Sequence, residues 1–370
     1  MIDRRLLKNF DYILFFLTLL ITSIGIAMIY SASYYHGHLL SPGGISYPFR
    51  QFIWVVIGLA ALLAVITVNY QTIMKYAYLL YGLNIFFLIL VLFFGTISRG
   101  ARRWINLGLF SFQPSELIKI TVILALAYYL RDRVREIKRV KGLLVPFGLV
   151  LLPFALIIKQ PDLGTALILL PILFIMLYMA GAKLRHLTVI VLIGMLVVAP
   201  LTYHFLLKDY QKARLTAFLN PNLDPLGASY SLNQSKIAIG SGQFRGEGWL
   251  KGSQTHLRFL TAQYTDFIFP VLAEEWGFVG SSILLLLYLT LLARGIAIAL
   301  RAKDSFGALL AVGLTTMIGS HIFINVGMTM GMMPITGLPL PLMSYGGSSL
   351  LITMLSIGLL LNVNMRRFMF

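Results

Sequence analysis

Apolar runs long enough to cross a membrane alternate with short polar segments along almost the whole chain. A helix needs about 20 mainly apolar residues to span the hydrocarbon core of a bilayer. Ten runs reach or approach that length, and they lie at 12–30, 51–67, 76–95, 114–130, 143–158, 163–180, 186–203, 268–293, 307–328 and 348–362. The pattern predicts an all-α fold, a polytopic membrane helix bundle of about ten transmembrane helices, with residues 1–370 as a single integral membrane domain.

Basic residues cluster between these runs and set the expected orientation. The chain has 30 Lys and Arg against 13 Asp and Glu. With ten spans, one side of the membrane receives all the clusters near 4–8, 131–141, 183–185, 294–303 and 366–367. Cytoplasmic loops carry an excess of Lys and Arg, so this side, with both termini, should be the cytoplasm. Basic residues confined to short loops argue against nucleic acid as the partner.

The opposite, extracytoplasmic side is expected to carry one long loop, about 204–266. Loops of this length usually have a function. A second outer loop, 96–113, contains Arg99, Arg102 and Arg103 against the positive-inside rule. These arginines either meet an anionic group at the outer face or anchor the loop to lipid headgroups, and the sequence leaves both readings open.

Acidic residues are few enough to be sorted by position. Five of the 13 lie at or beyond the cytoplasmic ends of the predicted helices. The other eight lie on the outer side, and they are Glu116, Asp162, Asp209, Asp224, Glu247, Asp266, Glu274 and Glu275. A reaction at the outer face therefore has several carboxylates to draw on, whereas a reaction at the inner face would have very few.

Three of the outer carboxylates stand in polar motifs at predicted helix starts. Glu116 and Lys119 share a helix face, either as a functional pair or as an ion pair that holds helix packing. Asp162 lies in the first turn of a predicted helix, where capping alone would explain a carboxylate. Asp266 stands where the long loop meets the membrane. There it is either a general base whose pKa is raised by desolvation or a helix N-cap.

Glycine and proline residues are frequent near the end of the chain. They are expected to break any helix over 325–349, and such backbone at membrane depth must be buried in protein or line a cavity. Gly-Gly-Ser-Ser, ending at Ser349, resembles an anion-binding helix start, with a plain loop as the alternative. The six histidines show no metal-ligand spacing, and the absence of cysteine excludes disulfide and thiol chemistry. No metal site is predicted.

Six motifs, in order along most of the chain, are highly specific when taken together. They are Gln113-Pro114-Ser115-Glu116 with Lys119, Gln160-Pro161-Asp162-Leu163-Gly164-Thr165, Gln234-Ser235-Lys236-Ile237-Ala238-Ile239-Gly240-Ser241-Gly242, Thr265-Asp266-Phe267-Ile268-Phe269, Glu274-Glu275-Trp276-Gly277, and Pro339-Leu340-Pro341-Leu342 through Ser349. On these motifs the chain resembles the SEDS family of bacterial shape, elongation, division and sporulation proteins. The step Pro334-Ile335-Thr336-Gly337 resembles the elongation branch of that family.

The resemblance implies a peptidoglycan glycosyltransferase in the bacterial cytoplasmic (inner) membrane. Its substrate would be lipid II, a disaccharide-peptide on undecaprenyl diphosphate, polymerised at the outer face during cell elongation. The resemblance also implies that Asp266 is the essential carboxylate, which we interpret as the general base of an inverting reaction. The implied partners are a class B penicillin-binding protein and the elongation machinery, in a setting of membrane lipid.

The leaving diphosphate of such a reaction needs positive charge or hydrogen-bond donors. The candidates for binding the substrate or its diphosphate are Arg102, Arg103, Lys119, Arg214, Lys236 and Ser349. The motifs supply four candidate supporting residues, Glu116, Asp162, Gln234 and Glu275. A divalent cation, Mg²⁺ or Mn²⁺, is left open as a cofactor, because the sequence shows no set of ligands for it.

Two rival functions need no bond-forming chemistry. A flippase that moves lipid II across the bilayer would also contain intramembrane charges such as Glu116 and Lys119. A scaffold for the penicillin-binding partner would need neither charge. The long outer loop with its carboxylate favours the enzyme, since a flippase requires polar groups at mid-membrane and on both faces.

Overall fold

Long apolar helices dominate the computed structural model of the chain. It describes residues 8–34, 45–98, 101–106, 111–205, 209–220, 227, 229–257 and 259–368. Eight helical segments in these ranges are long and apolar enough to span a membrane, so the chain is a multi-pass membrane protein. They comprise α2 (Tyr12–Tyr34), α3 (Tyr47–Thr67), α5 (Ala77–Phe94), η1 (Val140–Leu143) with α8 (Leu144–Lys159), α10 (Leu184–Ile193) with η2 (Gly194–Val198) and α11 (Ala199–Phe205), α15 (Ile268–Leu300), α16 (Ser305–Thr329) and α17 (Gly347–Met365).

Two shorter helices, α6 (Pro114–Leu130) and α9 (Leu163–Met179), coincide with the remaining predicted spans. Both are 17 residues long, and α6 is buried along nearly its whole length. Every predicted run therefore lies on a helix, which confirms an all-α membrane bundle of about ten helices. Because protein rather than lipid surrounds α6, this helix can carry charged side chains inside the bundle.

Glycines let the long helices approach closely. α17 packs along α3, and a Cβ added to Gly358 of α17 would lie 3.0 Å from the carbonyl oxygen of Leu62 on α3. Gly58 of α3 lies in the same way against Met354 of α17. Lipid-solvated helices gain little from apolar burial alone, so close packing through small residues is what joins them.

The described residues of the predicted outer loop, within 96–113, form a small sheet that the hydrophobic pattern did not predict. β1 (Thr96–Ser98), β2 (Ala101–Asn106) and β3 (Ser111–Phe112) are antiparallel, in the order β1-β2-β3. Trp104 pairs with Thr96, and Arg102 pairs with Ile97. The strands are too short for an alternating pattern to stand out in the sequence.

The long outer segment contains three helices, α12 (Asp209–Leu219), α13 (Tyr230–Ser241) and α14 (Ser253–His256). The turn after α13 packs backbone to backbone on α15. The amide nitrogen of Phe278 donates to the carbonyl oxygen of Gln243 at 2.9 Å, and that of Gly248 donates to Glu275 at 3.0 Å. α15 kinks at Gly277, whose φ of 63° is a conformation that side chains other than glycine rarely adopt.

An irregular stretch, residues 330–346, joins α16 to α17. It is narrower than the expected break over 325–349, because α16 continues to Thr329. Gly331 (φ 77°) and Gly337 (φ 74°) turn the backbone here, and three prolines deny the stretch helical hydrogen bonds. We refer to residues 330–346 below as the irregular stretch.

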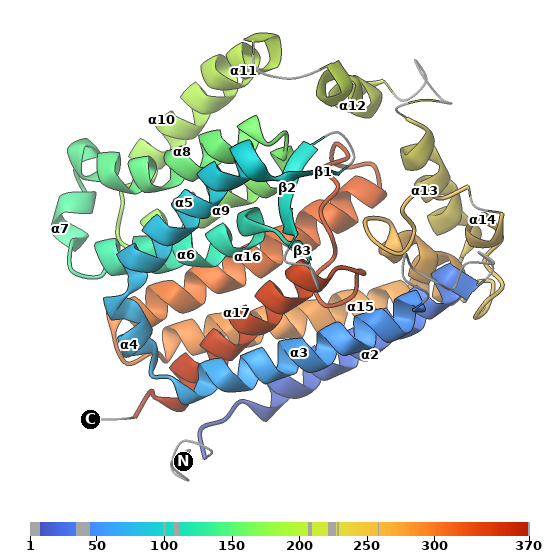
Figure 1. Cartoon of the computed structure of the whole chain (residues 1–370), viewed down its shortest axis with the longest axis horizontal. Helices are drawn as coiled ribbons and strands as arrows, with labels where there is room; N and C mark the ends of the chain where they lie inside the picture. The colour runs from blue at the N-terminus through green and yellow to red at the C-terminus, as the bar shows by residue number, and fades with distance from the viewer. Residues whose placement is uncertain are drawn as a thin grey trace.

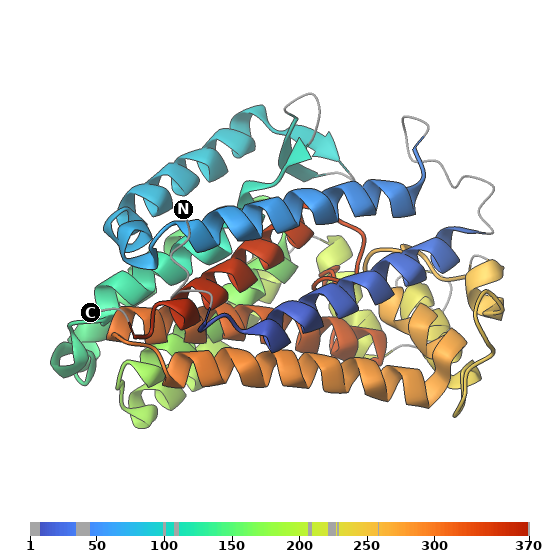
Figure 2. The same ribbon diagram turned by 90° about the horizontal axis from the view of Figure 1, so that it is seen from below.

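Different elements of the chain lie at the two ends of the bundle (Figures 1 and 2). The start of α2, the end of α17 and α7 (Val134–Ile137) lie at one end, which we call the terminal end. α13 and α14 lie at the other, which we call the opposite end. Termini that share an end require an even number of crossings, as the sequence predicted.

Side chains from several helices hold the terminal end together. Asp304 accepts hydrogen bonds from the Tyr70 hydroxyl at 2.7 Å and from Gln71 Nε2 at 3.1 Å, and it caps α16. Burial, aided by the Asp304 carboxylate, raises the pKa of Tyr70, so its hydroxyl remains a donor. The buried Asn362 of α17 donates to the carbonyl oxygens of Val65, at 2.6 Å, and Val68.

We expect the two ends to face opposite compartments, with the terminal end in the cytoplasm. The chain has no cysteine, so single-cysteine variants report one position each. Lys251→Cys, exposed beside α14, should react with a membrane-impermeant maleimide on intact cells. Lys138→Cys, exposed beside α7, should react only after permeabilisation. The reverse pattern of labelling would refute the predicted orientation.

A bidentate ion pair also ties α15 to the start of α2. Arg294 donates to Asp11 Oδ2 from Nε at 3.0 Å and from Nη2 at 2.6 Å. The Asp11 side chain is 1% exposed and that of Arg294 is 30% exposed. Removing the arginine would leave a carboxylate buried without its partner.

We therefore expect Arg294→Gln to lower the free energy of unfolding by about 1–3 kcal/mol, less than a fully buried pair because the arginine is partly solvated. Thermal unfolding in a fixed detergent measures the change. Arg301→Gln is the matched control, an exposed arginine at the same end of the same helix, and it should change stability by less than about 0.5 kcal/mol. Equal effects of the two substitutions would refute a structural role for the ion pair.

Candidate functional site

Asp266 lies in the turn that precedes α15, with a half-buried side chain. The N-cap position of α15 is taken by Phe267, without a side-chain cap hydrogen bond. A Cβ added to Gly337 would lie 3.4 Å from Asp266 Oδ2, so the carboxylate reaches the irregular stretch. The carboxylate is therefore one residue outside the standard cap position and faces a loop from another part of the chain.

Three consecutive carbonyl groups leading up to this carboxylate are hydrogen-bonded from the C-terminal part of the chain. The amide nitrogen of Tyr345 donates to Tyr264 O at 2.9 Å. The Ser344 hydroxyl donates to Thr265 O at 2.6 Å. Asn325 Nδ2 donates to Asp266 O at 2.9 Å. The turn bearing Asp266 is thus held on the irregular stretch and on the last turns of α16.

Three tyrosines pack beside this junction. The rings of Tyr47 and Tyr264 stack at 4.7 Å between centroids, and Tyr345 meets Tyr47 edge-on at 5.3 Å. Burial raises the pKa of Tyr345 above the ordinary tyrosine value, and its hydroxyl is protonated at neutral pH in either case. The cluster gives the Asp266 turn a rigid aromatic flank.

Glu116, Lys119 and His321 form a buried group within the bundle. Lys119 Nζ lies 3.0 Å from Glu116 Oε2 and 2.9 Å from His321 Nε2. The three residues are 5%, 1% and 4% exposed, so the ammonium is enclosed on all sides by protein. The sequence predicted the pair of Glu116 and Lys119 but assigned no partner to His321, which is 202 residues from the lysine.

Asp162 and Arg103 meet at the start of α9. Asp162 Oδ1 accepts a hydrogen bond from the amide nitrogen of Thr165 at 3.3 Å, the capping geometry that the sequence allowed. Arg103 donates to the carbonyl oxygens of Gln160, at 2.9 Å, and Pro161, and its Nη1 is 3.9 Å from Asp162 Oδ2. Arg103 therefore fastens the small sheet to the α8–α9 turn.

Two glutamates in the N-terminal part of α15 accept hydrogen bonds from neighbouring elements. Glu274 accepts hydrogen bonds from the Thr255 hydroxyl at 2.7 Å and from the amide nitrogen of Gln254 at 2.6 Å, so it holds α14. Glu275 is 1% exposed and accepts a hydrogen bond from the Ser31 hydroxyl of α2. Glu274 therefore connects α14 to the bundle, and Glu275 connects α15 to α2.

The remaining candidates are more open. Lys236, on α13, is exposed, and its Nζ would lie 2.6 Å from a Cβ on Gly331 of the irregular stretch. Gln234 is half-buried two residues before Lys236 on the same helix, and Arg214 is exposed on α12. Ser349 is half-buried in the first turn of α17. The side chain of Arg102 lies outside the described part of the structure, as do Arg99 and Asp224 entirely.

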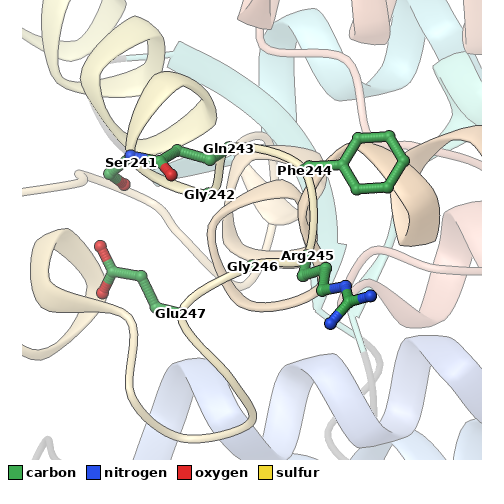
Figure 3. A pocket seen from close by; sticks show the side chains of 7 residues that line it. All are labelled: Ser241, Gly242, Gln243, Phe244, Arg245, Gly246 and Glu247. Atoms are coloured by element: carbon green, nitrogen blue, oxygen red, sulfur yellow. The ribbon is translucent and has the colours of Figure 1, made fainter.

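The irregular stretch brings several of these motifs together. Gly337 faces Asp266, Gly331 faces Lys236, and Gly164 of the Asp162 motif lies against Leu338. A hollow of about 590 Å³ lies elsewhere, at the turn after α13, and is lined by residues 241–247 (Figure 3). Glu247, one of the outer carboxylates, lines this hollow, as do Ser241 and Gly242 of the third motif. Among the described residues, none of those assigned to catalysis or to diphosphate binding lines it, so we assign the site to the neighbourhood of Asp266.

Asn325, Ser344 and His321 are the residues of this region to which the sequence gave no role. His321 and Asn325 are four residues apart on α16 and both buried. Two polar side chains at that spacing inside a predicted span are the signal that could have singled them out. Within the described ranges, no group of three or more His, Asp or Glu side chains is arranged to hold a metal ion.

Known proteins resemble this chain both in sequence and in fold. The chain matches the cell cycle protein family of FtsW, RodA and SpoVE over residues 11–368. Peptidoglycan glycosyltransferase MrdB of Escherichia coli is 41% identical over 319 residues, which cover 86% of this chain and 85% of that protein. Peptidoglycan glycosyltransferase RodA of Treponema pallidum is 37% identical and covers 98% of this chain, with 99% of its own length aligned.

Solved structures agree with these matches. One chain of a peptidoglycan synthase complex that coordinates polymerization and crosslinking superposes with a TM-score of 0.84 at 35% identity, covering 98% of this chain and 99% of that one. Rod shape determining protein RodA of Thermus thermophilus superposes with a TM-score of 0.72 at 33% identity, covering 98% of each chain. The chain therefore belongs to the FtsW/RodA/SpoVE family, the SEDS proteins that its six motifs resemble.

Proposed function

We propose that this chain is a peptidoglycan glycosyltransferase that polymerises lipid II into β-1,4-linked glycan strands during cell elongation. Relatives that align over most of the chain are peptidoglycan glycosyltransferases by name. The observation that carries the chemistry is the Asp266 carboxylate, held at the opposite end of the bundle beside the irregular stretch. We place this end on the outer face of the bacterial cytoplasmic membrane, in a single integral membrane domain.

The reaction needs one base and one stabilised leaving group. The 4-hydroxyl of one lipid II attacks the anomeric carbon of the growing chain and loses its proton to Asp266. The new glycosidic bond forms as the bond to the α-linked diphosphate breaks, so the configuration inverts. The electron pair of the broken bond leaves with the undecaprenyl diphosphate, and the proton stays on the carboxylate until water removes it.

Cations around Asp266 divide into two groups by their surroundings. Lys236 is exposed next to the irregular stretch, so it is placed to meet a diphosphate. Two further cations, Arg102 and Arg214, are assigned to the same task on the sequence alone, and Ser349 is assigned to it as a hydrogen-bond donor. Lys119 is enclosed by Glu116 and His321, so its charge supports the bundle beneath the site.

A partner completes the assembly in this proposal. A class B penicillin-binding protein would crosslink the strands that this chain makes, within the elongation machinery. The support is the solved peptidoglycan synthase complex, whose description joins polymerization to crosslinking. The apolar surface of the long helices, with exposed side chains such as Phe93 and Phe278, faces lipid and any partner helix alike.

The second candidate function is lipid II transport without bond formation. The buried group of Glu116, Lys119 and His321 is the observation that favours it, since intramembrane ionisable residues mark transport paths as well as enzyme sites. Purified protein with labelled lipid II in detergent separates the two functions. Glycan ladders would support the enzyme, whereas their absence together with transport in liposomes would support the flippase.

Asp266→Asn tests the catalytic assignment. The substitution keeps the size of the side chain but removes the base, so polymerisation should fall about 10²–10⁴-fold. The measured quantity is the initial rate of glycan formation from labelled lipid II by purified protein. Asp132→Asn is the matched control, because Asp132 is 74% exposed at the terminal end, and it should retain the wild-type rate. Wild-type activity of Asp266→Asn would refute the assignment and make Glu116 or Asp162 the next candidate.

Separate substitutions of Arg102 and Arg103 distinguish substrate binding from structural anchoring. Arg102→Gln should raise KM for lipid II while leaving membrane insertion and thermal stability unchanged. Arg103→Gln should lower the free energy of unfolding by about 1–2 kcal/mol, because it releases the carbonyl groups of Gln160 and Pro161. Steady-state kinetics and thermal unfolding on the same preparations provide the comparison. An unchanged KM in Arg102→Gln would leave headgroup anchoring as the explanation for that arginine.

A further inference from the structure

Asn325 is a fully buried side chain of α16 that joins two loops distant in sequence. Its Nδ2 donates to Asp266 O at 2.9 Å and to Leu338 O at 2.7 Å. The first acceptor lies 59 residues before Asn325 and the second lies 13 residues after it. One amide group therefore fixes the spacing between the Asp266 turn and the irregular stretch.

Pinning this carbonyl restricts the carboxylate itself. The carbonyl carbon and Cβ of Asp266 are attached to the same Cα, so holding the peptide plane limits where the side chain can point. On its other side the carboxylate lies against Gly337, whose φ of 74° is a backbone conformation that favours glycine. Ser344 adds a second tie one residue earlier, through its hydrogen bond to Thr265 O.

The orientation of the Asn325 amide follows from its partners. Both neighbours of Nδ2 are carbonyl oxygens, which accept hydrogen bonds but cannot donate them. A flipped amide would place its oxygen against two acceptors. In the orientation shown, Oδ1 is buried and has no hydrogen-bond partner among the described residues.

We propose that Asn325 is a positioning residue for Asp266, assisted by Ser344, and this proposal rests on the role of Asp266 as the general base. Asn325 does not touch substrate in this assignment. It holds the peptide plane of Asp266 so that the carboxylate is aimed at the attacking hydroxyl. A general base acts through its distance and angle to the proton it removes, so loosening this hold should slow the chemical step and leave substrate binding unchanged.

The chain contains a matched control for this chemistry at the other end of the bundle. Asn362 is also fully buried, and its Nδ2 also donates to two backbone carbonyl oxygens, those of Val65 and Val68. Asn325→Leu and Asn362→Leu both remove a double hydrogen bond to backbone carbonyl oxygens at similar side-chain volume. Asn362→Leu also removes the bonds that its Oδ1 accepts from Tyr70 N at 3.2 Å and from Arg366 Nη1 at 2.6 Å, so it should cost more stability. A purely structural role of Asn325 predicts an equal kcat per folded enzyme in the two variants.

The test measures kcat and KM for lipid II, together with thermal unfolding, on both purified variants. Both should lower the unfolding temperature. Asn325→Leu alone should lower kcat per folded enzyme, by about 10–100-fold for a displaced base, with KM within about twofold of wild type. Asn362→Leu should retain the wild-type kcat. Equal kcat values in the two variants would overturn the proposal.

Two further variants keep the outcome decisive. If Asn325→Leu does not fold, Ser344→Ala replaces it, and its kcat should fall about tenfold; a wild-type kcat would overturn the proposal. Asp266→Asn is measured in the same assay. If it is inactive while Asn325→Leu and Ser344→Ala keep wild-type kcat, the positioning role alone is wrong. If Asp266→Asn is active, the assignment of the base is wrong, whatever the other variants show.

Discussion

Backbone that leaves the helix inside a membrane protein must find its hydrogen-bond partners within the protein, because lipid offers none. The irregular stretch, residues 330–346, is in this position. Side chains from three helices supply its partners: Gln51 of α3 donates to Ser344 O at 3.1 Å, Tyr288 of α15 donates to Pro341 O at 2.6 Å, and Asn325 of α16 supplies a third contact. The packing of the bundle therefore sets the shape of the irregular stretch. Residues that contact the stretch, including Asp266, are held in place with it.

The close contacts between the candidate site and the irregular stretch involve the backbone of glycine residues. Gly337 meets Asp266, Gly331 meets Lys236, and Gly164 meets Leu338. A Cβ on Gly164 or Gly331 would lie less than 3.0 Å from the opposing residue, whereas one on Gly337 would make an ordinary contact of 3.4 Å. This explains why the chain carries its site in motifs rich in glycine and proline, and why the site shows no cluster of acids and histidines among the described residues.

The sequence predicted the helices well because length and apolar content decide whether a segment spans lipid, and both are local properties. It predicted the ion pair of Glu116 and Lys119 because the two residues share a helix face. It could not predict the third member, His321, since no local pattern joins residues 202 positions apart. For Asp162 it left capping and function open, and the structure shows capping geometry. The role of Asn325 depends on two loops meeting, which only the folded chain reveals.

The cations of this protein also differ in whether burial leaves their charge accessible to a ligand. A charge inside the bundle must be paired where it stands, because an unpaired ion in low dielectric is costly. Lys119, at 1% exposure between Glu116 and His321, has its hydrogen bonds committed within the protein. Lys236 remains exposed at the opposite end of the bundle, where its charge is available to a ligand. In the proposed function a diphosphate at this end would meet the exposed Lys236, while Lys119 stays paired with Glu116 and His321 inside the bundle.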